Sequence, residues 1–441
     1  MRRVTMGTAG MWTAAALAFL AGCGDGGGGG GGGSSSSGGA APGSEVRSSL
    51  PRVTSPIVSA DDRTALAAGN RAFATSLFQR LRSSGANVFF SPHSISEALA
   101  MAYAGARGTT ASQMETALHY SLGQAGLHNA FNELDLALAS RGQNAQSDAG
   151  VPFRLRAVNA TWGQSGYAFE PAFLDVMAAN YGAGLRVLDY ATDPDGSRQV
   201  INGWVSEQTE QKIPELIAPG LLTTSTRLVL TNAIYFHAAW AEPFDPEDTV
   251  QRPFTNADAT TANVDMVVGR RALNAGTGNG FTGVEIPYDG RELSMVVLRP
   301  DAGRFDDVEA ALDAPFLSAI IAGMTHQDVD LKLPKFRLEY SANLADTLKA
   351  LGMTDAFDSS TADFTGITVQ EQLFISDVVH KSFIGVDEKG TEAAAATAVV
   401  FAGSGVPTDV LDFEVNRPFI FLIRDLQTGA ILFMGRITQL G

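Results

Sequence analysis

The sequence predicts a single α+β domain in which helices pack on large mixed or antiparallel β-sheets. Helical periodicity dominates the first third of the folded part, and apolar or alternating strand patterns dominate the rest. A parallel α/β sheet would instead alternate the two patterns along the whole chain. No internal repeat and no second linker interrupts residues 60–441, so we expect one domain there.

Start and stop signals place the first two helices. The first is expected to begin near residue 60 with Asp61 or Asp62 as its N-cap, and Gly85 is expected to follow its end. A short strand over 87–90 precedes the second helix. That helix starts at Ser91-Pro92, because proline is favoured in the first helical turn, and it continues to about Tyr103.

The remaining elements follow from helical or strand periodicity and from the turn residues between them. Further helices are expected over 110–120, 171–179, 197–210 and, with Ser341 as N-cap, 341–351. Strands are expected over 153–161, 227–236, 263–268, 283–287, 292–298, 328–334, 373–381, 382–386, 413–416, 419–423 and 431–437.

The first 22 residues resemble a bacterial export signal, because two arginines precede a short apolar run, Met11–Leu20. That run is shorter than the roughly 20 apolar residues that a membrane-spanning helix needs. Leu20–Cys23 resembles the lipobox of bacterial lipoproteins, so we expect cleavage before Cys23 and lipidation of its side chain. An ordinary signal peptide followed by a chance cysteine is the alternative.

Cys23 is the only cysteine, so we expect no disulfide in the folded domain. Residues 23–59 are rich in glycine and serine and are expected to form the lipidated end and a flexible tether. We therefore expect an exported lipoprotein that its lipid anchors in a membrane. The expected location is the outer membrane, the cell surface or the periplasmic face. The outer membrane or cell surface is favoured because Gly24 follows the cysteine, although Asp25 stands one residue further.

Composition and motifs argue against several classes of function. The net charge of −16 disfavours a nucleic-acid partner, which requires a basic face. The six histidines are scattered without metal-ligand spacing, so no metal and no cofactor are expected. Gly278–Gly283 fits G-x-G-x-x-G, but a strand rather than a helix follows it. Ser404 lies between glycines outside a G-x-S-x-G elbow, and no catalytic constellation indicates an enzyme.

From about residue 60 to the end, the chain resembles the serpin family through motifs in the family's order. These motifs are Asn87–Ile95, Asn159–Trp162, Ile201–Val205, Leu230–Phe236, Pro334–Phe336, Val379–Lys381, Asn416–Phe419 and Leu432–Arg436. The resemblance implies a serpin fold with an exposed reactive loop at about 388–412. It also implies a monomeric inhibitor that a serine protease, or alternatively a cysteine protease, cleaves as a suicide substrate. The loop would then insert into the main sheet and trap the acyl-enzyme.

The residues before that loop support insertion independently of the resemblance. A strand that enters a sheet turns alternate side chains to opposite faces, so small core-facing residues are required. Gly390 supplies a hinge, and no proline interrupts the run up to Val400. The expected hinge is Glu388, Gly390, Thr391, Glu392, Ala393, Ala394, Ala395, Ala396 and Thr397, with Glu392 facing solvent. Taken alone, the run indicates an alanine-rich surface helix rather than an inserting strand, and only its place in a serpin-like chain reverses that preference.

The resemblance also implies where the protease cuts. Counting fourteen residues from the hinge glycine places the reactive bond at Ser404–Gly405, with Phe401 or Leu411 as alternatives because the loop is about three residues longer than usual. Ser404 would suit an elastase-like or subtilisin-like protease, and Phe401 a chymotrypsin-like one. No arginine or lysine lies between Thr391 and Phe413, which disfavours a trypsin-like target.

Two further groups of residues receive conformational roles from the resemblance. Ser91, Ser94, Asn232 and His380 match the cluster where the main sheet opens, and hydrogen bonds among them are expected to hold it closed. Trp240, Lys335 and Glu388 match the point where the loop enters, with an expected Lys335–Glu388 ion pair. The alternative function is a non-inhibitory serpin-like binding or chaperone module, whose relatives often carry bulky, charged or proline residues in the hinge.

Overall fold

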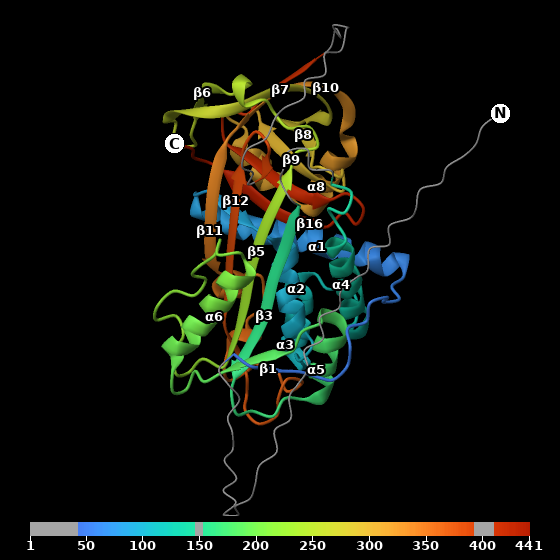
Figure 1. The fold of residues 1–441 in the computed structure, drawn as a ribbon, viewed down its shortest axis with the longest axis vertical. Coiled ribbons are helices and arrows are strands. Elements are labelled where there is room, and N and C mark those ends of the chain that lie inside the picture. Colours follow the sequence, from blue (N-terminus) through green and yellow to red (C-terminus); the bar gives the residue numbers. More distant parts are fainter. Residues whose placement is uncertain (1–42, 146–152, 392–409) are drawn as a thin grey trace, which may run out of the picture. The chain divides into compact units, whose positions relative to one another are not determined.

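The computed structural model describes residues 43–145, 153–391 and 410–441, which form two sheets and the helices around them (Figure 1). The helices are α1 (Ala60–Leu81), α2 (Pro92–Tyr103), α3 (Gly108–Leu118), α4 (Gln124–Ala139), α5 (Pro171–Val176), α6 (Pro194–Gln208), α7 (Phe305–Ala311), α8 (Ala314–Gly323) and α9 (Ala345–Ala350). This arrangement of helices on large mixed sheets confirms the predicted α+β class.

The main sheet has seven strands. Their order is β1 (Glu45–Val46), β4 (Leu185–Leu188), β3 (Arg154–Gln164), β5 (Leu228–Ala239), β13 (Gly390–Thr391), β12 (Ile375–Val386) and β11 (Phe336–Asn343). Most neighbours are antiparallel, but β3 pairs with β4 in parallel and β5 pairs with β12 in parallel. The β5–β12 pair at the centre of the sheet is therefore parallel.

The second sheet contains the C-terminal strands. Its order is β14 (Leu411–Glu414), β10 (Thr325–Pro334), β7 (Thr261–Gly278), β8 (Phe281–Pro287), β9 (Leu293–Pro300), β15 (Phe419–Asp425), β16 (Ile431–Ile437) and β2 (Val88–Phe90), with β6 (Val250–Thr255) paired to β7. The G-x-G-x-x-G motif falls in the β7–β8 hairpin, so no helix N-terminus follows it.

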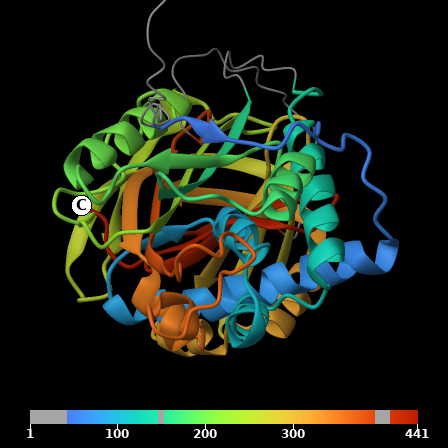
Figure 2. The same cartoon turned by 90° about the horizontal axis from the view of Figure 1, so that it is seen from below.

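Two hydrophobic cores lie on opposite faces of the main sheet. The larger core joins both sheets to α1, α2, α3 and α4. The smaller core lies under α6, where Trp162 and Val229 of the sheet meet Ile201 and Val205 of the helix. Seen from below, α6 covers one side of the main sheet and α1 lies on the other (Figure 2). Any strand that entered this sheet would therefore contact packed side chains on both faces.

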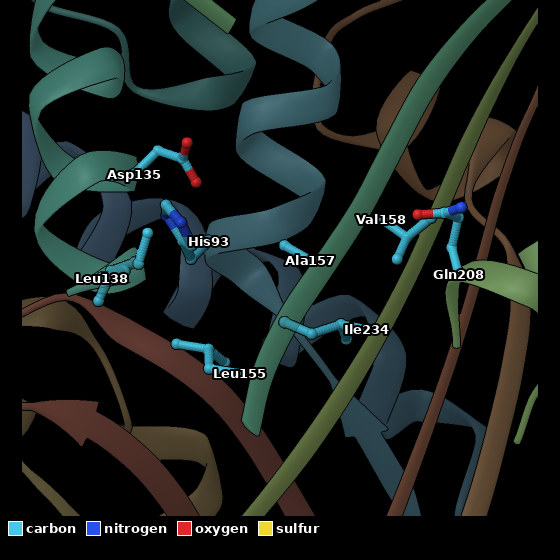
Figure 3. Close-up of a pocket in the computed structure, with 9 residues that line it drawn as sticks. His93, Asp135, Leu138, Leu155, Ala157, Val158, Gln208 and Ile234 are labelled. Atoms are coloured by element: carbon cyan, nitrogen blue, oxygen red, sulfur yellow. The ribbon is translucent and has the colours of Figure 1, made fainter. Parts of the chain in front are cut away.

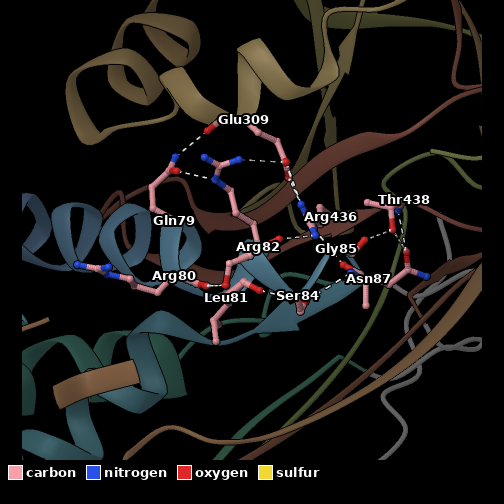
Figure 4. Close-up of polar contacts among 12 residues, drawn as sticks. Gln79, Arg80, Leu81, Arg82, Ser84, Gly85, Asn87, Glu309, Arg436 and Thr438 are labelled. Carbon is pink, nitrogen blue, oxygen red and sulfur yellow. Dashed lines mark hydrogen bonds and ion pairs between the residues drawn. The ribbon is translucent and has the colours of Figure 1, made fainter. Parts of the chain in front are cut away.

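The C-terminal strand β16 is fastened by a buried polar network (Figure 4). Arg436 of β16 forms an ion pair with Glu309 of α7 at 2.8 Å, and both side chains are buried. The same guanidinium donates to the carbonyl oxygens of Arg82 at 2.6 Å and Ala86 at 3.0 Å. Removing one partner of a buried pair costs about 3–5 kcal/mol, so this contact holds residues near the C-terminus firmly on α7 and on the turn that follows α1.

The N-terminal boundary differs from the sequence-based expectation. The composition predicts a flexible tether over 23–59, but residues 43–59 pack on the folded domain. β1 extends the main sheet by pairing with β4, and Val53 donates its backbone N–H to the carbonyl oxygen of Ala179 at 2.8 Å. The composition of this segment is polar, and the backbone hydrogen bonds that order it have no signature in the side-chain pattern.

Helix caps account for two more corrections. The N-cap of α1 is Ser59, whose Oγ accepts from the backbone N–H of Asp62 at 3.0 Å, so neither Asp61 nor Asp62 is the cap. Ser341 belongs to β11 rather than to a helix, and the helix after it begins at Ala345. The two strands expected over 373–381 and 382–386 form the continuous strand β12. Helices α4, α7 and α8 and strands β1, β4, β6 and β11 have no counterpart among the predicted elements.

Candidate functional site: a hinge seated between two parallel strands

The first residues of the expected hinge lie inside the main sheet. Strands β5 and β12 pair directly in parallel from Ile375↔Leu228 to Phe383↔Tyr235. Above that stretch, the short strand β13 separates them and runs antiparallel to both. The upper end of the β5–β12 seam is thus parted by two residues, while the lower part is closed (Figure 1).

Both residues of β13 fit their places closely. Gly390 lies so near β5 that a Cβ atom there would meet the carbonyl oxygen of Ala238 at 2.1 Å. Thr391 is fully buried, and its hydroxyl lies 2.7 Å from the hydroxyl of Tyr288. The Tyr288 ring in turn stacks on Trp240, with ring centroids 4.7 Å apart. We call the position of Gly390 and Thr391 between β5 and β12 the seat. Its close contacts leave room only for a glycine followed by a small polar residue.

Trp240 holds the turn that delivers the chain to this seat. Its backbone N–H donates to the carbonyl oxygen of Lys389 at 2.7 Å, and its indole Nε1 donates to that of Asp387 at 2.9 Å. The Asp387 carboxylate accepts from the backbone N–H groups of Lys389 and Gly390. Burial raises the pKa of Asp387 more than these hydrogen bonds lower it. Sequence reasoning missed Asp387, whose role follows from a turn that no motif marks.

Glu388 is anchored beside the seat by two donors. Lys335 Nζ lies 2.8 Å from Glu388 Oε1, so the expected ion pair is present, and Thr249 donates to the same oxygen at 2.7 Å. Burial alone would raise the pKa of Glu388, but the hydrogen bonds from Lys335 and Thr249 outweigh it and hold that pKa below its ordinary value. The Glu388 side chain is 11% exposed and that of Lys335 33%, so the pair is only partly screened by water.

A buried polar cluster lies lower on the same two strands. Asn232 of β5 and His380 of β12 are register partners, and His380 Nδ1 lies 2.5 Å from Asn232 Oδ1. Asn232 Nδ2 donates to Ser94 Oγ at 2.6 Å. Ser91 contributes through its backbone N–H, which donates to His380 Nε2 at 3.4 Å. The cluster thus joins β5, β12 and α2 across the seam below the hinge.

Two members of this cluster were missed from the sequence. Asn159 of β3 accepts from Asn232 at 2.5 Å and from Ser94 at 3.1 Å, and it donates to Glu97 of α2 at 2.8 Å. Asn159 lies in a strand, where its side chain looks like a surface residue, so only the register of β3 against β5 reveals its partner. Burial lowers the pKa of His380 to about 3, so its imidazole is neutral at physiological pH.

The fold and this seam agree with a known family. A family model described as "Serpin (serine protease inhibitor)" matches residues 68–440. The chain belongs to the serpin family. It is 38% identical over 397 residues to an uncharacterized serpin-like protein of Thermococcus kodakarensis, covering 89% of this chain and 90% of that protein.

The chain is also similar to a named protease inhibitor and to a serpin of known structure. The chain is 39% identical over 386 residues to the leukocyte elastase inhibitor of Bos taurus, covering 85% of this serpin and 99% of the relative. The crystal structure of the thermophilic serpin Tengpin in the native state superposes with a TM-score of 0.81 at 26% identity, covering 91% of this chain and all of that one.

Several predicted residues of this serpin lie outside the described ranges. They are Cys23, Glu392, Ala393, Ala394, Ala395, Ala396, Thr397, Phe401, Ser404 and Gly405. Within the described ranges, no three histidine, cysteine or acidic side chains gather where they could share a metal ion. None of the helices in those ranges combines the length and apolar character that a bilayer crossing requires.

Proposed function

We propose that this serpin inhibits a serine protease by acting as a suicide substrate. The protease serine attacks the carbonyl carbon of Ser404, and an ester bond to Ser404 forms as the peptide bond to Gly405 breaks, leaving Gly405 with a free amino group. The freed loop then enters the main sheet before water hydrolyses the ester. The observation that carries this proposal is the position of Gly390 and Thr391 between two parallel strands that pair directly below them.

The pairing of the seated hinge sets a register for the residues that follow. Thr391 is opposite Ala238 on β5 and Val386 on β12. If the inserting strand continues in this antiparallel register, the sixth residue after Thr391 is opposite the residues numbered six below Ala238 and Val386. Thr397 then falls between Asn232 and His380, so its hydroxyl would enter the polar cluster as those two side chains separate. The core-facing positions along the way are Thr391, Ala393, Ala395, Thr397, Val399 and Phe401.

Such an insertion would make the main sheet more stable. One parallel β5–β12 ladder is replaced by two antiparallel ladders, and antiparallel pairing is slightly more stable per residue. The entering residues are mostly alanine and valine, whose small side chains need little room against the two cores, and Phe401 is the one large core-facing residue among them. Each backbone hydrogen bond adds roughly 0.5–1.5 kcal/mol, which offsets the conformational entropy lost by the loop.

The finer assignments are proposals of the same kind. A reactive bond after Ser404 suits an elastase-like or subtilisin-like protease, and a cut after Phe401 would indicate a chymotrypsin-like one. The chain acts as a monomer without cofactor or metal, and a cysteine protease is a second class of target. Lipidation of Cys23 would hold the inhibitor at an extracytoplasmic membrane face, with residues 24–42 as the remaining tether now that residues 43–59 belong to the domain.

Incubation with purified elastase-like, subtilisin-like and chymotrypsin-like proteases tests the proposal. We expect a covalent complex on denaturing gels, a released peptide that begins at Gly405, and a higher thermal midpoint for the cleaved inhibitor. Cleavage within the loop by every protease, with no complex and no gain in thermal stability, would refute inhibition. That result would favour the non-inhibitory binding or chaperone module instead.

A further inference from the structure

A carboxyl group stands at one end of the hydrogen bonds that cross the main sheet below the hinge. Helix α2 runs beside β3 and β5 (Figure 3), and Glu97 of this helix is 6% exposed. Its Oε2 accepts from Asn159 Nδ2 of β3 at 2.8 Å, and Asn159 Oδ1 accepts from Asn232 Nδ2 of β5 at 2.5 Å. Asn232 Oδ1 lies 2.5 Å from His380 Nδ1 of β12. We call this row of four side chains, Glu97–Asn159–Asn232–His380, the relay.

The backbone fixes the direction of the relay at its β12 end. The N–H of Ser91 can only donate, and it points at His380 Nε2 at 3.4 Å. Burial lowers the pKa of His380 to about 3, so the imidazole is neutral at pH 7 and carries a single proton. Because Nε2 accepts, that proton lies on Nδ1, which then donates to Asn232 Oδ1. Asn232 consequently turns its Nδ2 towards Asn159, and Ser94 Oγ joins the two amides in the same direction.

The α2 end of the relay requires an acceptor, and Glu97 supplies it. Each amide accepts on one side and donates on the other, so Asn159 presents its Nδ2 to α2. An apolar side chain at position 97 would leave this N–H group without its partner. Burial, and next the Asp135 carboxylate, raise the pKa of Glu97 more than Asn159 and Arg52 lower it. A carboxyl oxygen accepts in either protonation state, so the relay does not depend on the charge of Glu97.

We propose that Glu97 is a positioning residue for loop insertion. By accepting from Asn159, it orients both amides of the relay and keeps the proton of His380 on Nδ1, where that proton bonds β12 to β5. The consequence for insertion rests on the proposed function. The loop enters only where β5 and β12 separate, and their separation breaks the Asn232–His380 bond. A relay with both ends fixed keeps the partners of this bond aligned, so Glu97 opposes premature opening of the sheet from outside both strands.

NMR of the full chain without its leader, isotope-labelled in the nitrogens of its six histidine rings, reads the position of the proton directly. His380→Gln identifies the signals of this ring by removing them. We expect the wild type to carry the proton of His380 on Nδ1 at neutral pH. A proton on Nε2 would overturn the direction of the relay and with it the inference.

Three variants separate the acceptor from the charge and from general stability. Glu97→Gln keeps an acceptor oxygen and should leave the His380 ring and the exchange of its proton with water unchanged. Glu97→Leu removes the acceptor and should make that proton exchange about 10-fold faster, which corresponds to about 1.4 kcal/mol, the loss of one hydrogen bond. Leu134→Ala truncates a buried side chain of α4 outside the relay, so it should lower the thermal midpoint without this acceleration.

Each variant can also contradict the inference. Unchanged exchange in Glu97→Leu would show that Glu97 does not orient the relay. Equal acceleration in Leu134→Ala and Glu97→Leu would show only a general loss of stability. Equal acceleration in Glu97→Gln and Glu97→Leu would show that the charge of Glu97, rather than its acceptor oxygen, is required.

A synthetic peptide with the sequence of residues 391–401 tests the link to insertion, because it can enter the sheet in place of the loop. We expect Glu97→Leu to take up this peptide about 10-fold faster than the wild type, and Glu97→Gln to take it up at the wild-type rate. Equal uptake by Glu97→Leu and the wild type would overturn the role of Glu97 in insertion. The expected NMR results with no uptake by any form would instead contradict insertion itself, while the role of Glu97 in the relay would stand.

Discussion

Replacing Thr391 with arginine tests whether the hinge must be small to enter the sheet. Thr391 has no exposed surface, and its hydroxyl is bonded to Tyr288. The substitution leaves the buried Tyr288 hydroxyl without that partner, at about 1–3 kcal/mol, and brings an unpaired guanidinium into the seam at a cost of several kcal/mol. The introduced side chain can leave this position in the intact inhibitor but must be buried when the whole loop inserts, so the penalty falls on the inserting state. A penalty of only about 3 kcal/mol there would slow insertion roughly 100-fold, since about 1.4 kcal/mol changes a rate tenfold.

The assay compares covalent complex with cleaved inhibitor at full consumption of the chain. We expect Thr391→Arg to be cleaved at the same bond as the wild type but to give mainly cleaved product, because hydrolysis of the ester now outruns insertion. Thr391→Val keeps the size of the side chain and should retain most of the complex. Glu392→Arg is the matched control for charge, since its side chain is expected to face solvent one residue further along.

An undiminished yield of complex from Thr391→Arg would refute the argument that insertion proceeds through this seat. A loss of complex in both Thr391→Arg and Glu392→Arg would show that positive charge anywhere on the loop disturbs the protease, not that the buried position excludes large residues. Unchanged cleavage rates in all three variants would confirm that the protease still recognises the reactive bond.

Three other predictions concern the Lys335–Glu388 pair, the buried His380 and the Arg52–Asp135 pair. Lys335→Met removes the partner of Glu388 and should release the hinge turn, giving polymers on native gels at a lower temperature than the wild type; an unchanged onset would contradict a restraining role. His380 has a folded pKa lowered to about 3, so the unfolded chain alone binds its proton below pH 6.5. Stability should fall as the pH drops from 6.5 towards 3, by at most about 1.4 kcal/mol per pH unit from this group, and His380→Gln should flatten the thermal midpoint's pH profile. Arg52→Ala should lower stability by about 1–2 kcal/mol in chemical unfolding, because Arg52 joins the N-terminal segment to Asp135; an unchanged midpoint would show that residues 43–59 are only loosely attached.

The elements that sequence analysis located are those with a strong local signal. Strand β16 has the bounds that the sequence predicts, because it is apolar apart from Gly435 and Arg436 and follows a turn at Asp425–Gly429. Helix α2 was placed because Ser91 and Pro92 mark its start, and Ser91 is indeed its cap. Helix α8 was missed even though Asp313 caps it, because its apolar residues do not fall on one narrow stripe.

Features created by long-range pairing could not be read from the chain. The strand β1 is two residues long and exists only because β4 offers it an edge. Asn159 joins the polar cluster only because β3 lies beside β5 in one register. The resemblance to serpins located Asn232, His380 and the Lys335–Glu388 pair, but the position of Gly390 and Thr391 between β5 and β12 is set by the folded sheet and has no local signal in the sequence.

Hydrogen exchange of residues 392–401 before and after cleavage tests the insertion mechanism most directly. Peptides from this segment can be followed by mass spectrometry in the intact inhibitor, in the cleaved inhibitor and in the covalent complex. We expect the segment to become strongly protected after cleavage, to the level of β5 and β12, because its backbone N–H groups then donate to both strands. Exchange after cleavage at the rate of an unstructured peptide, with β5 and β12 unchanged, would contradict insertion.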